Sequence, residues 1–265
     1  MSCASATLVV WTSAWLHGAA AADDVLDALG FWAEQHEVVA DDDGTATALD
    51  LPGPDESAVG SALLLAALRR ASASTARLVL PVPGDVRGLG GRGPLSQSAL
   101  RAGQAAVLPE VGVGLVPWLV ADGVLRWTVF DLPTAPVAEH VPIGEAEHGL
   151  TSAMREAATA LVTLDVARHR PNVRAEIAGL SAEHTRLPWP AGMPPRALRV
   201  LQRASEVAAI LTVAASDAPG GAMSASAQAA RDEALRPLSE AVRRARLAAV
   251  GEAVRVLSDQ EAGRH

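Results

Sequence analysis

The stretch VLPVPGDVRGLGGRGPLSQSAL, residues 79–100, contains the residue types that could bind an anion. Its glycines lie between an apolar run typical of a strand and a helical pattern that begins near Leu95. Backbone N–H groups at the start of a helix attract negative charge, and arginine side chains add to this attraction. The spacing GLGGRG lacks the Gly-Lys-Ser/Thr ending of a nucleotide-binding loop. The alternative is that this segment only connects a strand to a helix and binds no ligand, since glycines are also common where the chain changes direction.

We predict a ligand-binding site built from this loop and a second one, the segment 12–18 after the first strand. Ligands of α/β sheets collect where such loops diverge at the carboxyl ends of strands. An aromatic face beside a cationic edge would suit a planar anion, or a nucleotide base with its phosphate. In the alternative interpretation, Asp85 only pairs with an arginine across a surface loop. The predicted ligand-binding residues are Trp15, His17, Asp85, Arg87, Gly90, Gly91 and Arg92.

Other kinds of site have no motif in this chain. The seven histidines are scattered, and both HExxH and paired cysteines are absent, so we predict no metal site. GxSxG is absent as well, and the sequence identifies neither a catalytic residue nor a cofactor. Because these absences are weak evidence against catalysis, an enzyme whose active site is built from loops remains an alternative.

The composition excludes several classes of protein. The net charge is −8 and the pI is near 5.4, so the chain has no excess of basic residues for the phosphates of a nucleic acid. The uncharged run VAAILTVAAS is too short to span a bilayer. The apolar run near the N-terminus lacks the basic residues that precede a signal sequence. A single cysteine, Cys3, fits a reducing compartment. We therefore predict a cytoplasmic protein that binds neither nucleic acid nor membrane.

The first half of the chain alternates between strand and helix patterns. Short β-branched apolar runs predict buried strands, and apolar residues at a spacing of three and four predict helices. Asp-Gly pairs between two apolar runs predict hairpin turns. The predicted elements are a strand at 7–11, a helix at 21–35, a hairpin at 36–52, a helix at 55–74, a strand at 76–82, a helix at 95–108 and a hairpin at 111–133, which turns at Asp122-Gly123.

The two predicted hairpins resemble one another. The segments 38–52 and 119–133 have equal length and agree at seven positions, including the ending Asp-Leu-Pro. Each is preceded by a strand, a loop and a helix, and each is followed by another helix. This order indicates a β-α-β-β-α unit used twice, with Asp50 and Asp131 in equivalent positions.

From Gly144 onward the patterns are helical. One of three apolar stripes, from Leu198 to Ala215, is apolar most of the way round, so it should be buried in the core or at a homodimer interface. Pro237 should kink the last helix or start a new one. Proline- and glycine-rich breaks separate the helices at 187–195 and 216–222. An antiparallel bundle is the expected arrangement.

Six tryptophans stand against two phenylalanines and no tyrosine. Trp11, Trp32, Trp118 and Trp127 fall on strand or helix patterns and are predicted to be core residues. Trp189 lies between two prolines, where it either packs on the helices or contacts a partner.

These patterns predict the α/β class, with α+β as the alternative. A mixed sheet domain should occupy residues 1–140, and a helical region packing on or beside the sheet should occupy residues 141–265. The predicted function is non-catalytic: binding of a small anionic or nucleotide-like ligand, or of a protein partner, in the cytoplasm. The alternatives are an enzyme with a loop-built active site and a structural module that forms oligomers, such as a homodimer.

Overall fold

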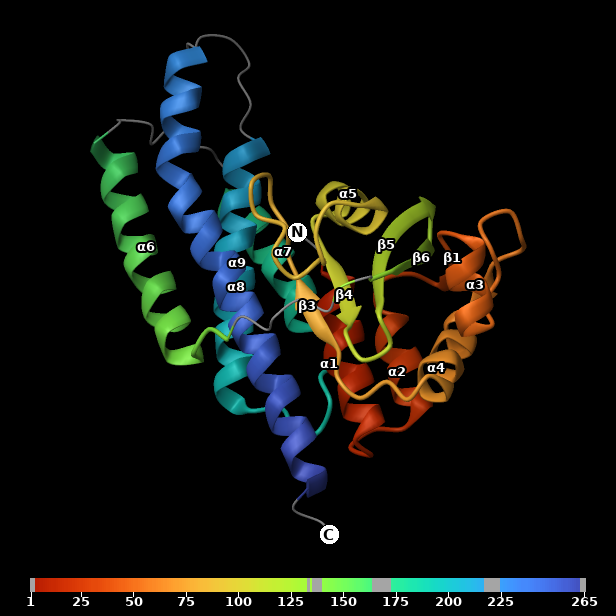
Figure 1. Ribbon diagram of the computed structural model, residues 1–265. Helices are drawn as coiled ribbons and strands as arrows, with labels where there is room; N and C mark the ends of the chain where they lie inside the picture. The colour runs from red at the N-terminus through yellow and green to blue at the C-terminus, as the bar shows by residue number, and fades with distance from the viewer. Residues whose placement is uncertain (1–2, 133, 135–139, 164–172, 217–224, 263–265) are drawn as a thin grey trace. The chain divides into compact units, whose positions relative to one another are not determined.

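The computed structural model describes residues 3–132, 134, 140–163, 173–216 and 225–262 (Figure 1). The chain divides into two compact units. The sheet unit contains Ser2–His140, Pro188–Pro194 and Val250–His265, and the helical unit contains Val141–Leu187 and Pro195–Ala249.

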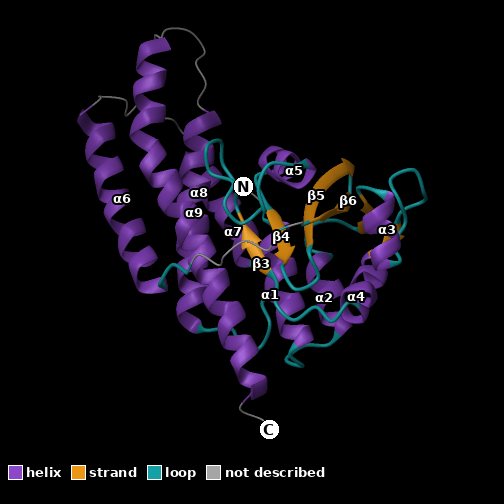
Figure 2. Cartoon of the chain, viewed as in Figure 1, coloured by secondary structure: helices purple, strands orange, loops and turns teal. Residues whose placement is uncertain are grey.

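The sheet unit has a six-stranded mixed sheet with helices between its strands (Figure 2). The order of the strands is β2-β1-β6-β5-β4-β3; β1 and β6 are parallel, and the other neighbouring pairs are antiparallel. The predicted α/β class is confirmed. The strands are β1 (Gln35–Ala40), β2 (Val59–Gly60), β3 (Arg77–Val79), β4 (Ala105–Leu108), β5 (Val113–Ala121) and β6 (Val124–Asp131). The helices are α1 (Ala4–Leu16), α2 (Ala22–Leu29), α3 (Asp43–Leu49), α4 (Ser61–Arg70) and α5 (Pro94–Ala102).

The first predicted strand is wrong, because residues 7–11 lie inside α1. Every residue of α1 from Ala4 to Trp15 is buried, so this helix has no polar face to reveal its period. A continuous apolar run is equally typical of a buried strand, and only its length separates the two. As a result, most of the predicted loop at 12–18 is helix.

The first predicted hairpin is also wrong, and the predicted duplication fails with it. Residues 35–40 form β1 as expected, but 43–49 form α3. Asp42 begins this helix: its Oδ1 accepts a hydrogen bond from the backbone N–H of Thr45 at 2.8 Å. Asp50, which ends α3 with φ of 54°, has no equivalence to Asp131 at the end of strand β6. The Asp-Gly pair here lies in the first turn of a helix.

The second predicted hairpin is confirmed, since β5 and β6 are antiparallel neighbours joined at Asp122-Gly123. The predicted helix at 95–108 is correct only in its first part. It ends at Ala102, Gly103 takes φ of 69°, and 105–108 form the fully buried strand β4. The sequence AAVL is compatible with a helix and with a strand, and its burial between neighbouring strands favours the strand.

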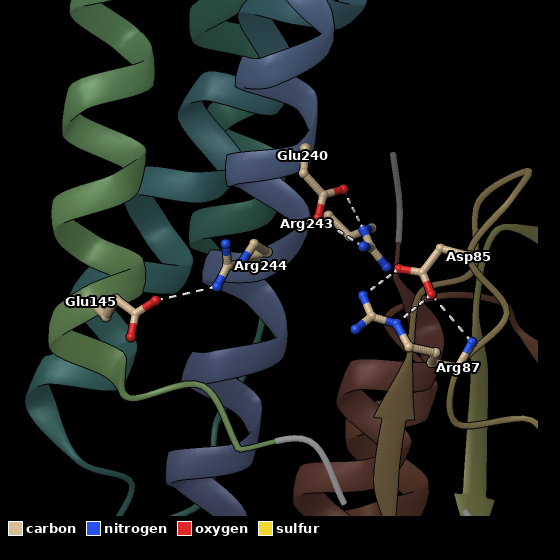
Figure 3. Close-up of polar contacts among 6 residues, drawn as sticks. All are labelled: Asp85, Arg87, Glu145, Glu240, Arg243 and Arg244. Carbon is tan, nitrogen blue, oxygen red and sulfur yellow. Dashed lines mark hydrogen bonds and ion pairs between the residues drawn. The ribbon is translucent and has the colours of Figure 1, made fainter.

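The helical unit contains α6 (Ile143–Thr163), α7 (Val173–Thr185), α8 (Pro195–Ser216) and the first part of α9 (Ala225–Ala262), which confirms the predicted C-terminal helices. Arg244 on α9 pairs with Glu145 on α6 at 3.3 Å, and Arg243 pairs with Glu240 one turn away (Figure 3). α9 continues through Pro237, so no new helix begins there.

The predicted apolar stripe of the helical unit is only partly buried. Val200, Val207 and Val213 on α8 are buried, whereas Ile210 is 44% exposed. The break at 187–195 separates α7 from α8, while the second break lies mostly outside the described residues. Among the helices that the structure describes, none combines the length and apolarity needed to cross a bilayer.

Both faces of the sheet are packed. On one face, a cluster of buried side chains joins α5 to the strands, including Leu95, Val107, Val116 and Phe130. On β6, whose side chains alternate between the faces, Trp127 points opposite to Phe130 and is 0% exposed. Of the tryptophans predicted as core, Trp11 and Trp127 are buried, and Trp32 and Trp118 are half-buried. Trp189 is half-buried too.

Trp127 forms a hydrogen bond with a half-buried histidine, His36, on the neighbouring parallel strand. His36 Nε2 lies 2.9 Å from the carbonyl oxygen of Leu29, which can only accept, so this nitrogen carries the proton. His36 Nδ1 therefore accepts a hydrogen bond from Trp127 Nε1 at 3.0 Å. Burial lowers the pKa of His36 below its usual 6.5, since the charged imidazolium is poorly solvated there.

We expect the stability of the protein to fall as the pH drops below 6.5, because the unfolded chain then binds a proton that folded His36 resists. The loss continues until the pH reaches the lowered pKa of the folded state. The measurement is the midpoint of urea unfolding between pH 7.5 and 5 for wild type and His36→Phe. The variant should lose less stability on acidification than wild type. Equal losses in the two proteins would refute this role of His36.

Candidate functional site

A cleft of about 250 Å³ opens at the carboxyl ends of β1 and β6. Because these two strands run parallel, both end at the same edge of the sheet, the usual position of ligands in α/β folds. The glycine-rich loop and the start of α5 complete the cleft. It is lined by Asp41, Asp42, Leu89, Gly90, Gly91, Arg92, Gly93, Pro94, Leu95, Ser96, Phe130 and Asp131.

One wall of the cleft is acidic. Asp41 and Asp42 follow β1 directly, and Asp131 is the last residue of β6. The carboxylate of Asp42 is occupied, since it accepts hydrogen bonds from the backbone N–H of Thr45 at 2.8 Å and from the Thr45 hydroxyl at 3.1 Å. The backbone hydrogen bond is the main cause of the lowered pKa of Asp42.

Asp41 differs from Asp42, because its carboxylate has no partner among the residues that the structure describes. Its backbone N–H donates to the carbonyl of Val129 at 2.8 Å, which fixes the residue beside β6. Its side chain is half-buried and makes no hydrogen bond or ion pair with any residue that the structure describes. Burial, and secondly the charge of Asp42, raise the pKa of Asp41.

The glycine-rich loop forms another part of the cleft lining, and packing holds it in a fixed position. Leu89 is buried in the core cluster next to Phe130. Gly90 has φ of 71° and lies so close to the chain after β6 that a Cβ there would be 2.9 Å from the carbonyl oxygen of Thr134. The loop conformation is therefore set before any ligand arrives, as binding without a large ordering cost requires.

The loop leads into α5 and leaves amide donors at the cleft. Gly93 N–H donates to Ser96 Oγ at 2.9 Å, and this hydroxyl donates to the carbonyl of Gly93 at 3.0 Å. Pro94 is the first helical residue and has no N–H. The backbone N–H groups of Leu95 and Ser96 belong to the first turn of α5, where a helix supplies no acceptor. Both residues line the cleft, and N–H groups at the start of a helix are favourable partners for an anion.

Arg92 gives the loop its positive charge. Its side chain is exposed and lines the same cleft as the three aspartates. Within the described parts of the chain it forms no ion pair or hydrogen bond. A guanidinium that is near carboxylates and yet unpaired is available to a ligand.

The structure brings together three of the seven predicted site residues: Gly90, Gly91 and Arg92. Trp15 is buried at the end of α1, where the guanidinium of Arg69 lies 4.3 Å from its ring. His17 Nδ1 is 2.9 Å from the carbonyl oxygen of Ser13. Neither residue lines the cleft, because the segment expected to be a loop is mostly helix.

Asp85 and Arg87 also lie outside the cleft lining. They pair with one another: Arg87 Nε donates to Asp85 Oδ1 at 2.8 Å, and Nη2 donates to Oδ2 at 2.9 Å (Figure 3). This is the alternative that the sequence left open for Asp85. The pair belongs to the turn at the start of the loop, where Val82 and Asp85 exchange two backbone hydrogen bonds.

Sequence reasoning missed the acidic wall. A signal for it was present, because the apolar runs VVA and TVF each end in aspartate. Those aspartates lie close together only if the two runs form neighbouring parallel strands. The prediction assigned each run to a separate hairpin, so it did not pair them. Among the described residues, no group of three or more histidine, cysteine, aspartate or glutamate side chains is arranged to hold a metal ion.

Comparisons with known proteins find relatives along nearly the whole chain. Residues 5–140 match the Rv1486c-like protein, N-terminal domain, and residues 144–247 match the corresponding C-terminal domain. Uncharacterized protein Rv1486c of Mycobacterium tuberculosis is 42% identical over 282 residues, covering 94% of this chain and 96% of the relative. Uncharacterized protein ML1804 of Mycobacterium leprae is 36% identical over 288 residues, covering 94% and 97%. No solved structure matches the chain.

Proposed function

The chain belongs to the Rv1486c-like protein family, and the names of the relatives above specify no activity. We therefore propose a function from the cleft itself: it binds a small anionic ligand. The observation that carries this proposal is Arg92, a cation that lines the cleft and has no partner in the described chain. The first-turn amides of α5 supply neutral donors beside it.

The size of the cleft limits the ligand. Its volume of about 250 Å³ is below the range of roughly 300–1,000 Å³ that is usual for sites of drug-sized molecules. A phosphate, a phosphorylated metabolite of a few carbons or a small carboxylate fits this volume. A dinucleotide would extend far outside it. A nucleotide could place only its phosphate and sugar in the cleft, with the base lying beyond it.

We expect Arg92→Ala to weaken the binding of inorganic phosphate at least about tenfold, the value of one charge-assisted hydrogen bond. Binding is measured by calorimetry and as a rise in melting temperature, which any ligand specific for the folded state produces. Arg101→Ala is the matched control, because Arg101 is exposed on the last turn of α5 and does not line the cleft. The proposal fails if no anion raises the melting temperature, or if both variants bind phosphate equally.

Asp41 supports a second candidate function, an enzyme acting on the bound anion. A carboxyl group with a raised pKa inside a cleft is typical of acid–base catalysts. The test is release of inorganic phosphate from a panel of phosphomonoesters. Turnover that disappears in Asp41→Asn and persists in Asp122→Asn, a change in the exposed hairpin turn, would favour the enzyme. Absence of turnover together with phosphate binding would favour the non-catalytic function.

A further inference from the structure

We infer that the ligand of the cleft is bipolar: a phosphomonoester whose opposite end carries hydrogen-bond donors, and that Asp41 is the residue that selects this end. The inference rests on the proposed anion site and specifies its ligand. Its basis is the contrast between two parts of the cleft lining, the loop with Arg92 and the ends of β1 and β6 with their aspartates.

The acidic wall excludes a ligand that is anionic throughout. Asp41, Asp42 and Asp131 line the cleft together, so a second negative group placed against them would meet like charges. An ionised carboxylate has only acceptor sites, and it is satisfied by hydroxyl, amide or ammonium donors. A ligand that fills the cleft must therefore direct its anion towards the loop and its donors towards the aspartates.

Asp41 is the carboxylate best placed for this contact. Asp42 already accepts two hydrogen bonds from Thr45, whereas Asp41 accepts none from the described residues. The side chain of Asp41 is half-buried, and that of Asp131 is exposed to water. Water molecules can satisfy the exposed carboxylate of Asp131 fully. The carboxylate of Asp41 is partly buried, so it has fewer hydrogen bonds with water to give up when a ligand binds. A donor from the ligand consequently gains more at Asp41.

Two sources of donors share this chemistry, hydroxyl groups and an ammonium group, and three probes of similar size separate them. Methyl phosphate carries no donor at its far end, glycerol 3-phosphate carries hydroxyls, and phosphoethanolamine carries an ammonium group. Affinities are measured by calorimetry on the full chain for wild type, Asp41→Asn, Asp41→Ala and the control Asp122→Asn. Circular dichroism and thermal melts establish that each variant is folded.

Wild type should bind at least one donor-bearing probe about fivefold or more tighter than methyl phosphate. Asp41→Ala should reduce this ratio towards one, while methyl phosphate binds equally well or better because a negative charge has been removed. Asp41→Asn, which keeps a neutral acceptor, should retain part of a hydroxyl preference and lose an ammonium preference. Asp122→Asn should behave as wild type.

The inference is overturned if methyl phosphate binds as tightly as both other probes, or if the ratio survives in Asp41→Ala. Failure of all three probes and of inorganic phosphate would instead overturn the proposed anion site, and the inference with it. The two failures are thus distinguishable, since the first leaves phosphate binding dependent on Arg92 and the second removes phosphate binding altogether.

Discussion

Trp127→Ala is expected to lower the free energy of unfolding by about 3–5 kcal/mol, the usual cost of truncating a fully buried tryptophan. The side chain of Trp127 is 0% exposed, on the central strand β6. Its removal leaves a cavity and also leaves Nδ1 of His36 without its donor. Because His36 lies on β1, the damage extends to both strands that end at the cleft.

The measurement is urea unfolding followed by circular dichroism, with Trp118→Ala as the control. Trp118 lies on the neighbouring strand β5, is half-buried and donates to the hydroxyl of Ser98 at 3.2 Å. Its truncation should cost less than about 3 kcal/mol, because water already reaches part of the ring. If Trp118→Ala proves as costly as Trp127→Ala, the complete burial of Trp127 does not determine the cost of its truncation.

Local patterns predict the elements that have one polar and one apolar side. The hairpin of β5 and β6 was predicted correctly because the turn pair Asp122-Gly123 lies between two apolar runs. The helix α1 was not, because it is buried from Ala4 to Trp15 and shows no period. The sequence DDDGT at the start of α3 is compatible with a turn and with a helix cap, and the hydrogen bond from the Thr45 N–H to Asp42 shows that it forms the cap.

The candidate site was predictable on one wall only. Gly90, Gly91 and Arg92 are close together in the sequence, and their chemistry is visible in one loop. The acidic wall depends on β1 pairing with β6, in which Val39 lies opposite Thr128. Such a contact between distant segments is set by how several elements pack, and no periodicity within either segment reports it. The same packing separates Trp15 and His17 from the cleft.

Gly90→Ala is expected to destabilise the protein and to weaken phosphate binding in the same variant. Gly90 has φ of 71°, and a non-glycine residue pays about 1–2 kcal/mol for such a left-handed conformation. Its Cβ would also lie 2.9 Å from the carbonyl oxygen of Thr134 and 3.0 Å from Leu132 Cδ1. Relieving these contacts moves the loop and raises the total cost to about 2–5 kcal/mol.

Gly103→Ala is a closely matched control for this change. Gly103 has φ of 69° at the end of α5, and a Cβ there would meet no atom within 4 Å. It therefore has the conformational cost of about 1–2 kcal/mol without any steric displacement.

Unfolding free energies and phosphate affinities are measured for both variants at a temperature where each is folded. We expect Gly103→Ala to bind phosphate as wild type does and Gly90→Ala to lose at least about tenfold in affinity, since amide donors act only when they are correctly positioned. Equal phosphate affinity in the two variants would show that the contact between the loop and Thr134 does not shape the anion site.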